Sequence, residues 1–266
     1  MKKQTMMISA LSLSVALLAG CAKDPASSNL TMTISNVATV AKVTNNVNAA
    51  PAAPVTFTDG VTEFTITEAR MHIRDIRFDT SDTANVGERY TITGPYVMNL
   101  MDGTAQPSNI VFDAPAGEYK RVDIRLDEAN VEDAPLAAGD VLLGNALVIK
   151  GTHDYGTPGT NAGTFSLTVK VSEDIRFEPV TGIVVGTDTG ANINLVYNVT
   201  DWLEDPDVAL AGSGAKIDVS ACIAANPGVL DAGTGHITLD EGTQCAEGSF
   251  GNIIKDNMKN KYDFSS

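Results

Sequence analysis

Four carboxylates stand close together in one acidic stretch of the chain, and this type of residue can hold a cation. They are Asp201, Glu204, Asp205 and Asp207, and Trp202 lies among them. Calcium takes several carboxylate and carbonyl oxygens from a flexible loop, so this stretch could bind calcium weakly. The spacing departs from the Asp-x-Asp-x-Asp-Gly pattern of calcium-binding loops, and a solvated acidic loop is the alternative. Apart from weak calcium, we expect no metal and no noncovalent cofactor.

Basic side chains occupy alternate positions of one predicted strand. Arg70, His72 and Arg74 alternate with apolar residues over 69–74, which predicts one cationic and one apolar strand face. The cationic face could pair with acidic residues on neighbouring strands, or it could meet an anionic partner such as a glycan or a lipid head group. A second acidic segment, 127–133, has the same two interpretations as the first.

Two short strings match motifs of hydrolases. Residues 188–191 read Asp-Thr-Gly-Ala and resemble the active loop of retropepsin-like aspartic proteases, where the aspartate shares a proton with its dimer mate. That family needs an apolar pair and a glycine downstream, whereas the best such triplet here, 142–144, lies upstream. A turn between two strands explains the string, so a hydrolase using Asp188 is a minor alternative. Ser213 and Lys216 match Ser-x-x-Lys without the companion motifs of penicillin-recognising enzymes.

The chain has three histidines, His72, His153 and His236, and their spacing favours no metal site. None forms a His-x-His or His-x-x-x-His pair, which a zinc site on one strand or helix would show. We therefore predict that all three are surface residues.

Two of the three cysteines are expected to form a disulfide. Cys222 and Cys245 would lie in an oxidising compartment after export, where pairing is the default. Their bridge would contribute on the order of 3 kcal/mol to stability. A metal or redox pair is the alternative, but no Cys-x-x-Cys occurs and no histidine stands at ligand spacing.

The remaining cysteine, Cys21, closes a predicted signal peptide over 1–20. Two lysines precede a short apolar run, and small residues precede the cut, which describes a secretory signal. Residues 18–21 read Leu-Ala-Gly-Cys and resemble the lipobox of bacterial lipoproteins. The resemblance implies cleavage before Cys21 and attachment of diacylglycerol and a fatty acid to it, a stable membrane anchor. Ala22 after the cysteine resembles outer-membrane sorting. An ordinary secretory signal is the alternative.

The net charge of −15 at pH 7 argues against one class of partner. An acidic surface repels phosphate backbones, so we expect no nucleic-acid binding. No apolar run after Cys21 approaches the length that spans a bilayer, and the lipid is the only membrane contact that we expect.

The elements that must position these residues are short strands. Residues 21–54 lack aromatic residues and predict a flexible tether with a possible first strand at 30–34. Predicted strands follow at 55–58, 64–66, 69–74, 122–126, 146–150, 165–171 and 193–199. Turn residues separate them, which indicates a single all-β antiparallel sandwich over 55–266. We also predict a bulge at 75–76, a strand-like segment 217–219 leading to Cys222, a buried Trp202 and a short helix over 251–261.

Four blocks of sequence carry a wider resemblance. They are residues 64–78, 114–122, 197–203 and 253–259. In this order they resemble a group of uncharacterised bacterial lipoproteins with an immunoglobulin-like or transthyretin-like β-sandwich. The resemblance implies that fold and a place in the cell envelope, and it implies no reaction.

The sequence therefore favours a protein that is not an enzyme. We expect a lipid-anchored protein of the bacterial cell envelope, at the outer membrane, that acts as a non-enzymatic binding or structural module. Its partner would be an unknown protein or glycan. The alternative is an accessory or carbohydrate-binding subunit of a secreted enzyme or an outer-membrane complex.

Overall fold

The computed structural model describes most of the chain after the predicted signal peptide. The described residues are 27–36, 54–80, 89–107, 110–133, 136–156, 162–178, 182–185, 191–197, 199–205, 215–260 and 263–265. Strands dominate them, and the prediction of an all-β sandwich is confirmed.

The larger sheet has ten strands, in the order β11-β8-β3-β9-β10-β15-β14, while β2 and β4 also pair with β3 and β5 pairs with β4. Their bounds are β2 Val55–Thr58, β3 Glu63–Asp79, β4 Arg89–Asn99, β5 Thr104–Gln106, β8 Arg121–Leu126, β9 Leu147–His153, β10 Gly163–Val169, β11 Glu173–Phe177, β14 Leu230–Asp231 and β15 His236–Leu239. Most neighbours are antiparallel, but β10 and β15 run parallel. That parallel pair joins segments far apart in the sequence.

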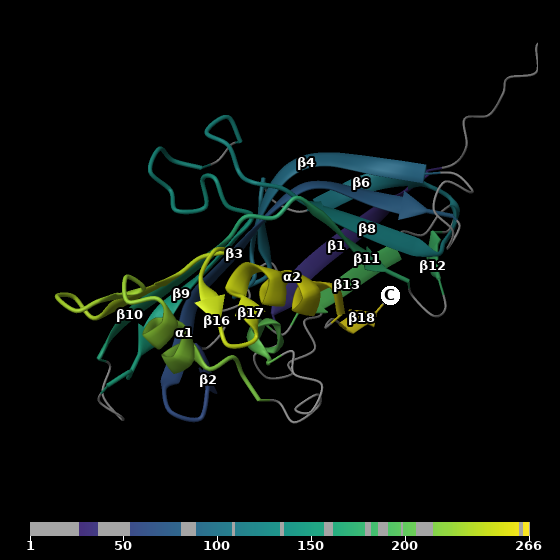
Figure 1. Cartoon of the computed structure of the whole chain (residues 1–266). Coiled ribbons are helices and arrows are strands. Elements are labelled where there is room, and N and C mark those ends of the chain that lie inside the picture. The colour runs from purple at the N-terminus through teal and green to yellow at the C-terminus, as the bar shows by residue number, and fades with distance from the viewer. Residues whose placement is uncertain are drawn as a thin grey trace, which may run out of the picture.

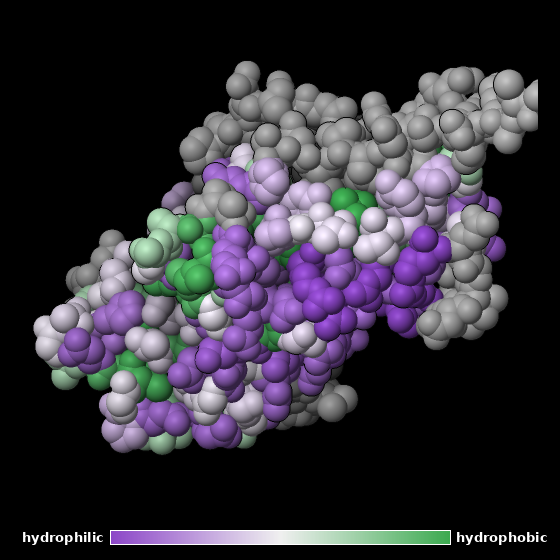
Figure 2. Space-filling view, turned by 90° about the horizontal axis from the view of Figure 1, so that it is seen from above, coloured by the Kyte–Doolittle hydropathy of each residue, from purple (hydrophilic) through white to green (hydrophobic). Residues whose placement is uncertain are grey.

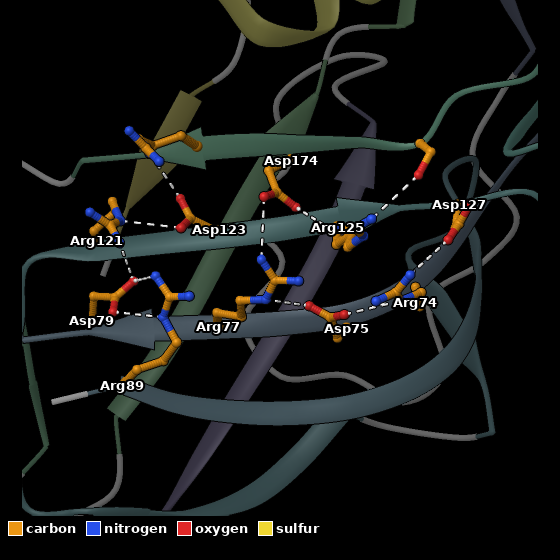
Figure 3. A network of polar contacts seen from close by, with 12 residues as sticks. Arg74, Asp75, Arg77, Asp79, Arg89, Arg121, Asp123, Arg125, Asp127 and Asp174 are labelled. Carbon is orange, nitrogen blue, oxygen red and sulfur yellow. Dashed lines mark hydrogen bonds and ion pairs between the residues drawn. The ribbon is translucent and has the colours of Figure 1, made fainter. Parts of the chain in front are cut away.

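The smaller sheet has four strands in the order β18-β13-β1-β6. Their bounds are β1 Ser27–Asn36, β6 Ile110–Pro115, β13 Ala191–Tyr197 and β18 Asp263–Ser265. The possible strand at 30–34 is confirmed as β1, which pairs parallel with β13 and antiparallel with β6. Figure 1 shows these strands beside β8 and β11, and in Figure 3 β1 crosses behind β3 and β8. The sandwich thus includes a strand that precedes residue 55.

The remaining elements are short. β7 (Gly117–Tyr119) pairs with β12 (Ile183–Val185), and β16 (Gln244–Cys245) pairs with β17 (Gly248–Ser249). A 3₁₀ helix, η1, covers Val199–Leu203, and the two α-helices are α1, Val219–Ala225, and α2, Phe250–Asn260. Among the described residues, no helix has the length and apolar character needed to cross a membrane.

The longest strand, β3, is interrupted where the alternation of its side chains slips. Its pairing with both β4 and β8 shifts register between Ile73 and Asp75, one residue before the predicted bulge at 75–76. Gly94 lies opposite, and a Cβ there would come within 2.7 Å of the carbonyl oxygens of Ile73 and Arg74. Only glycine allows this close approach of two backbones, so it fixes the place of the bulge.

Beyond the bulge, the sheet separates charged from apolar side chains. On β8, charged residues alternate with Val122 and Ile124, and on β3 they alternate with Ile76 and Phe78. These four apolar residues are buried in the main core. Because successive strand residues point to opposite faces, the charged residues share the other face of the sheet.

The sequence patterns predicted one of the two α-helices correctly and the other wrongly. The predicted C-terminal helix is confirmed as α2, with Ile253, Ile254 and Met258 buried. The prediction of a strand-like segment over 217–219 was wrong, because α1 begins at Val219 and Asp218 precedes it as the cap. Asp218 caps that helix, because its carboxylate accepts a hydrogen bond from the backbone N–H of Ala221 at 2.9 Å.

Candidate functional site

The acidic stretch singled out in the sequence lies on η1 and just after it. Asp201 and Glu204 both approach Lys216, which reaches them from the segment before α1. Nζ of Lys216 lies 3.3 Å from Oε1 of Glu204 and 3.6 Å from Oδ1 of Asp201. We call these three residues the Lys216 cluster. The ammonium group of Lys216 therefore contacts two of the carboxylates that were proposed as calcium ligands.

Backbone hydrogen bonds hold the two sides of the Lys216 cluster together. The N–H of Ile217 donates to the carbonyl oxygen of Leu203 at 2.8 Å, and the N–H of Asp205 donates to that of Ala215 at 3.0 Å. One such bond lies on each side of Lys216 along the chain. The two segments are therefore fixed in register on both sides of the ion pairs.

Helix α2 adds a third attachment through a buried amide. Nδ2 of Asn257 donates to the carbonyl oxygens of Trp202 at 2.9 Å and of Glu204 at 2.8 Å. The side chain of Trp202 is fully buried, which confirms its predicted place in the core. Asn257 therefore attaches η1, and the residue that follows it, to α2.

The electrostatics of the Lys216 cluster follow from its partial burial. The side chains of Lys216, Glu204 and Asp201 are 12%, 18% and 35% exposed. Burial lowers the pKa of Lys216 from its ordinary value, against the opposite effect of Asp201. Loss of solvent penalises the charged ammonium, so a neutral amine is easier to reach here than on the surface.

The weak calcium site stays a prediction. Of its four proposed ligands, Asp201, Glu204 and Asp205 are described, whereas Asp207 lies outside the described residues. Across the described part of the chain, no group of three or more His, Cys, Asp or Glu side chains is placed to hold a metal ion. Calcium binding at these carboxylates would have to compete with Lys216.

A second charged region, here called the arginine face, covers one side of the larger sheet. It contains six of the seven arginines of the chain. Figure 3 shows its labelled members, Arg74, Asp75, Arg77, Asp79, Arg89, Arg121, Asp123, Arg125, Asp127 and Asp174, to which Arg176 adds an ion pair with Asp123. Opposite charges alternate along β3 and across to β8 and β11. Arg70, His72 and Arg74, for which pairing with acids on neighbouring strands was predicted, do meet acidic residues. Their partners lie on β3 itself and in the loop after β8 instead.

The most buried part of the arginine face is an ion-paired arginine. Arg121 is fully buried, and it contacts a carboxylate oxygen of Asp79 as well as Oδ2 of Asp123, which lies 3.2 Å from its Nε. Nε of Arg89 lies 3.0 Å from Asp79, and Nε of Arg176 lies 3.0 Å from Asp123. Each buried carboxylate therefore meets two guanidinium groups, which compensates its loss of water.

The second acidic segment and the loop after it fasten onto β3. Arg70 makes a bidentate pair with Asp140, with both N···O distances at 2.8 Å, and Nη1 of Arg74 lies 3.0 Å from Oδ2 of Asp127. The hydrogen bond from Arg70 lowers the pKa of Asp140. The basic side chains predicted from the alternation over 69–74 thus hold the loop 127–145 against the sheet.

His72 lies beneath this loop, and its predicted surface position was wrong. Only 2% of the residue is exposed. Its Nδ1 lies 2.7 Å from the carbonyl oxygen of Asp127, and its Nε2 lies 3.3 Å from Oδ2 of Asp133. A polar strand face is buried here because the loop covers it, which alternation along β3 cannot reveal.

The prediction for His153 was also wrong, for a different reason. It is 2% exposed at the end of β9, where its ring packs near that of Phe64. Its Nε2 lies 2.8 Å from the carbonyl oxygen of Gly235. The turn before β15 therefore covers a histidine that looks like a loop residue in the sequence.

His236 lies beside two hydroxyl groups that the sequence pattern did not place near it. We call His236, Thr164 and Ser166 the hydroxyl group cluster. Its Nδ1 lies 2.8 Å from Oγ1 of Thr164, and its Nε2 lies 3.0 Å from Oγ of Ser166. Thr164 is exposed, while Ser166 and His236 are partly exposed. The alternation over 163–169 could have placed both hydroxyls on one face. Their meeting with His236 depends on the parallel pairing of β10 with β15.

Large apolar side chains are rarely exposed on the described part of the chain. Among the described residues, the exposed ones are Val61, Val131, Val141 and Val184. Figure 2 shows hydrophilic side chains gathered on the face seen from above, with apolar ones in small separate groups. Single exposed apolar side chains are normal on folded domains.

The other residues singled out from the sequence have mixed outcomes. Cys222 and Cys245 form the predicted disulfide, which joins α1 to β16. Cys21, Asp188 and Ser213 lie outside the described residues, so lipidation of Cys21 stays a prediction and the minor alternative of a hydrolase using Asp188 is not tested.

Comparison of the chain with protein-family models, with curated proteins and with solved structures finds no match.

Proposed function

We propose that this chain is a lipid-anchored protein of the bacterial cell envelope whose β-sandwich acts as a non-enzymatic binding or structural module. The observation that carries the proposal is the arginine face, where charged side chains pair with one another across four strands. Interlocked ion pairs and the disulfide suit a rigid support. The resemblance of residues 18–21 to a lipobox supports the anchor.

Metabolic labelling tests the anchor. Bacteria that express the full chain with an alkyne-tagged palmitate should label the protein, and the label should follow the outer-membrane fraction. A Cys21→Ala variant removes the thiol that would be acylated, so it should lose both the label and the membrane association. Labelling that survives in Cys21→Ala, or a wild-type protein that stays unlabelled and soluble, contradicts the proposal.

Protease treatment of intact cells would then show which side of the membrane the sandwich faces. If intact cells lose the protein, it faces outward, and binding to a glycan or a host surface becomes the leading role. If only permeabilised cells lose it, the sandwich hangs in the periplasm. Cross-linking to neighbouring envelope proteins is then the next experiment.

A second candidate function, a carbohydrate-binding subunit, is favoured by the hydroxyl group cluster. Thr164, Ser166 and His236 present hydrogen-bonding groups on the face of the larger sheet that is opposite to the core. Such groups match the hydroxyls of a neutral sugar chain, which offers donors and acceptors and no charge.

A glycan-binding screen tests this second candidate. The mature chain should retain a neutral polysaccharide in affinity electrophoresis, and the Thr164→Val variant combined with Ser166→Ala should weaken retention at least tenfold. Thr91→Val, on the exposed side of β4, is the matched control and should bind as the wild type does. Equal binding by the double variant and by Thr91→Val would contradict a role of the hydroxyl group cluster in glycan binding.

A further inference from the structure

The Lys216 cluster brings together three groups that can react with one another. Nζ of Lys216 lies 3.6 Å from Oδ1 of Asp201, a carboxyl group that the amine can attack, and 3.3 Å from Oε1 of Glu204, a second carboxyl group. An amine and a carboxylic acid condense to an amide when they are held in contact and one group moves the proton. The cluster therefore contains the reactants and a proton carrier.

The fold holds these groups in place before any reaction occurs. Asp201 lies on η1, which Asn257 attaches to α2, and Lys216 lies between the two backbone hydrogen bonds that join its segment to η1. Groups held in a reactive geometry can act as if present at effective concentrations on the order of 10⁵ M or higher. Such a concentration shifts the amide equilibrium toward condensation, which is unfavourable for separate molecules in water.

Partial burial makes the neutral amine that condensation needs easier to form. Loss of solvent penalises the charged ammonium group of Lys216, so it gives up a proton more readily than an exposed lysine does. Glu204 is the less exposed of the two carboxylates, and its Oε1 is nearer to Nζ. Asp201 is the more exposed carboxylate, so a water molecule released there can reach solvent.

We propose that Lys216 and Asp201 join in an intramolecular amide bond that the chain forms by itself. Glu204 takes a proton from the ammonium group of Lys216, and the amine so formed attacks Cγ of Asp201. Glu204 passes two protons in turn from the nitrogen to one oxygen of Asp201, which departs as water. The C–N bond forms, the C–O bond breaks, Glu204 ends as it began, and no oxidant or external reagent is needed.

The amide would close a covalent ring that includes the chain from residue 201 to residue 216. It would fasten η1 to the segment that leads into α1, which the disulfide already ties to β16. The cross-link does not depend on the proposed function, because it concerns the stability of the sandwich and not its anchor or partner.

The intact mass of the purified mature chain tests the cross-link. After reduction and alkylation of the disulfide, the wild type should weigh one water molecule less than the mass calculated for its sequence with the two alkyl groups and the lipid on Cys21 included. Lys216→Met, Asp201→Ala and Glu204→Gln should each show their full calculated mass. Glu204→Gln is the sharpest of these, because it keeps both bonding partners and removes only the proton carrier.

Digestion locates the bond. Trypsin should fail to cut after Lys216 in the wild type, because an acylated lysine is no substrate. Cleavage before aspartates should leave two peptides joined, one with Asp201 and one with Lys216, since Asp205 and Asp207 lie between them. A wild type of full calculated mass that trypsin cuts after Lys216 overturns the proposal and leaves Lys216 as a counter-ion.

Discussion

At the scale of single residues, the polar groups inside this sandwich are held by specific partners. Asn257 donates to one carbonyl oxygen in η1 and to another just after it, and Arg121 meets two aspartates. A buried polar group without a partner is costly, whereas a paired one is nearly neutral. Removing one partner should therefore lower the free energy of unfolding by more than the net contribution of a single hydrogen bond.

Asn257→Ala should lower the free energy of unfolding by about 1–3 kcal/mol, because it leaves the carbonyl oxygens of Trp202 and Glu204 without this donor. Asn260→Ala is the matched control on the same helix, where the side chain is exposed and bonds only locally to Asp256. It should change stability by less than about 0.5 kcal/mol. Urea unfolding measures both, and equal effects would show that Asn257 holds nothing in place.

Arg121→Met should be more damaging, at about 3–5 kcal/mol, because it removes a guanidinium group shared by the buried carboxylates of Asp79 and Asp123. Arg176→Met removes a half-exposed partner of Asp123 and should lower stability by less than about 1 kcal/mol. Thermal unfolding compares the two variants. Equal losses of stability in the two variants would show that the burial of Arg121 does not make its ion pairs more important for stability.

At the scale of elements, the loop 127–145 is held to β3 by charge. Arg70, His72 and Arg74 each meet an acidic or carbonyl oxygen from this loop. The loop also covers a small apolar group that includes Leu142 and Val148. Loss of its charged contacts should loosen the loop before the rest of the sheet.

The pH dependence of this attachment follows from Asp140. The hydrogen bond from Arg70 lowers the folded-state pKa of Asp140, so the ionised carboxylate stabilises the fold. That stability is fully present above the unfolded pKa, near 4, and is lost as the pH falls through the lower folded pKa. Asp140→Asn should remove up to about 1 kcal/mol at pH 7, because solvent screens a partly exposed pair, and should flatten the loss in acid.

Hydrogen exchange of the loop 127–145 between pH 7 and pH 3 measures this effect. Asp256→Asn, at an exposed position of α2, is the control and should keep the pH dependence of the wild type. A loop whose protection in Asp140→Asn still falls with acid as in the wild type would contradict the role of this pair.

At the scale of the whole molecule, the smaller sheet depends on a strand from the predicted tether. β1 lies between β13 and β6, and its backbone pairs with both. Without β1, two strands would face each other across an open gap in the sheet. Each would then present unpaired backbone groups along one edge, which favours aggregation.

Deletion of β1 should therefore abolish cooperative unfolding of the sandwich. A chain that begins at residue 54 loses both rows of backbone pairing, and a domain is stable by only about 5–15 kcal/mol in total. A chain that begins at residue 27 is the control and should unfold cooperatively. Circular dichroism during heating compares them, and equal transitions would show that β1 contributes nothing to folding.

The sequence alone determined those features of this protein that depend on near neighbours in the chain. Alternation predicted β3, β8 and β10, and a helical pattern predicted α2. Pairing of Cys222 with Cys245 was also predictable, because only two cysteines remain once Cys21 is set apart. In each case, the deciding interaction lies within a few residues or admits few alternatives.

Only the tertiary structure decided which polar residues are buried and which distant groups meet. Loop 127–145 buries His72, the parallel pairing of β10 with β15 brings Ser166 to His236, and the segment before α1 places Lys216 among the acidic residues of η1. Burial and contact depend on which segments pack over a strand face. Alternation shows that a face is polar, but packing between segments far apart in the sequence determines what covers it.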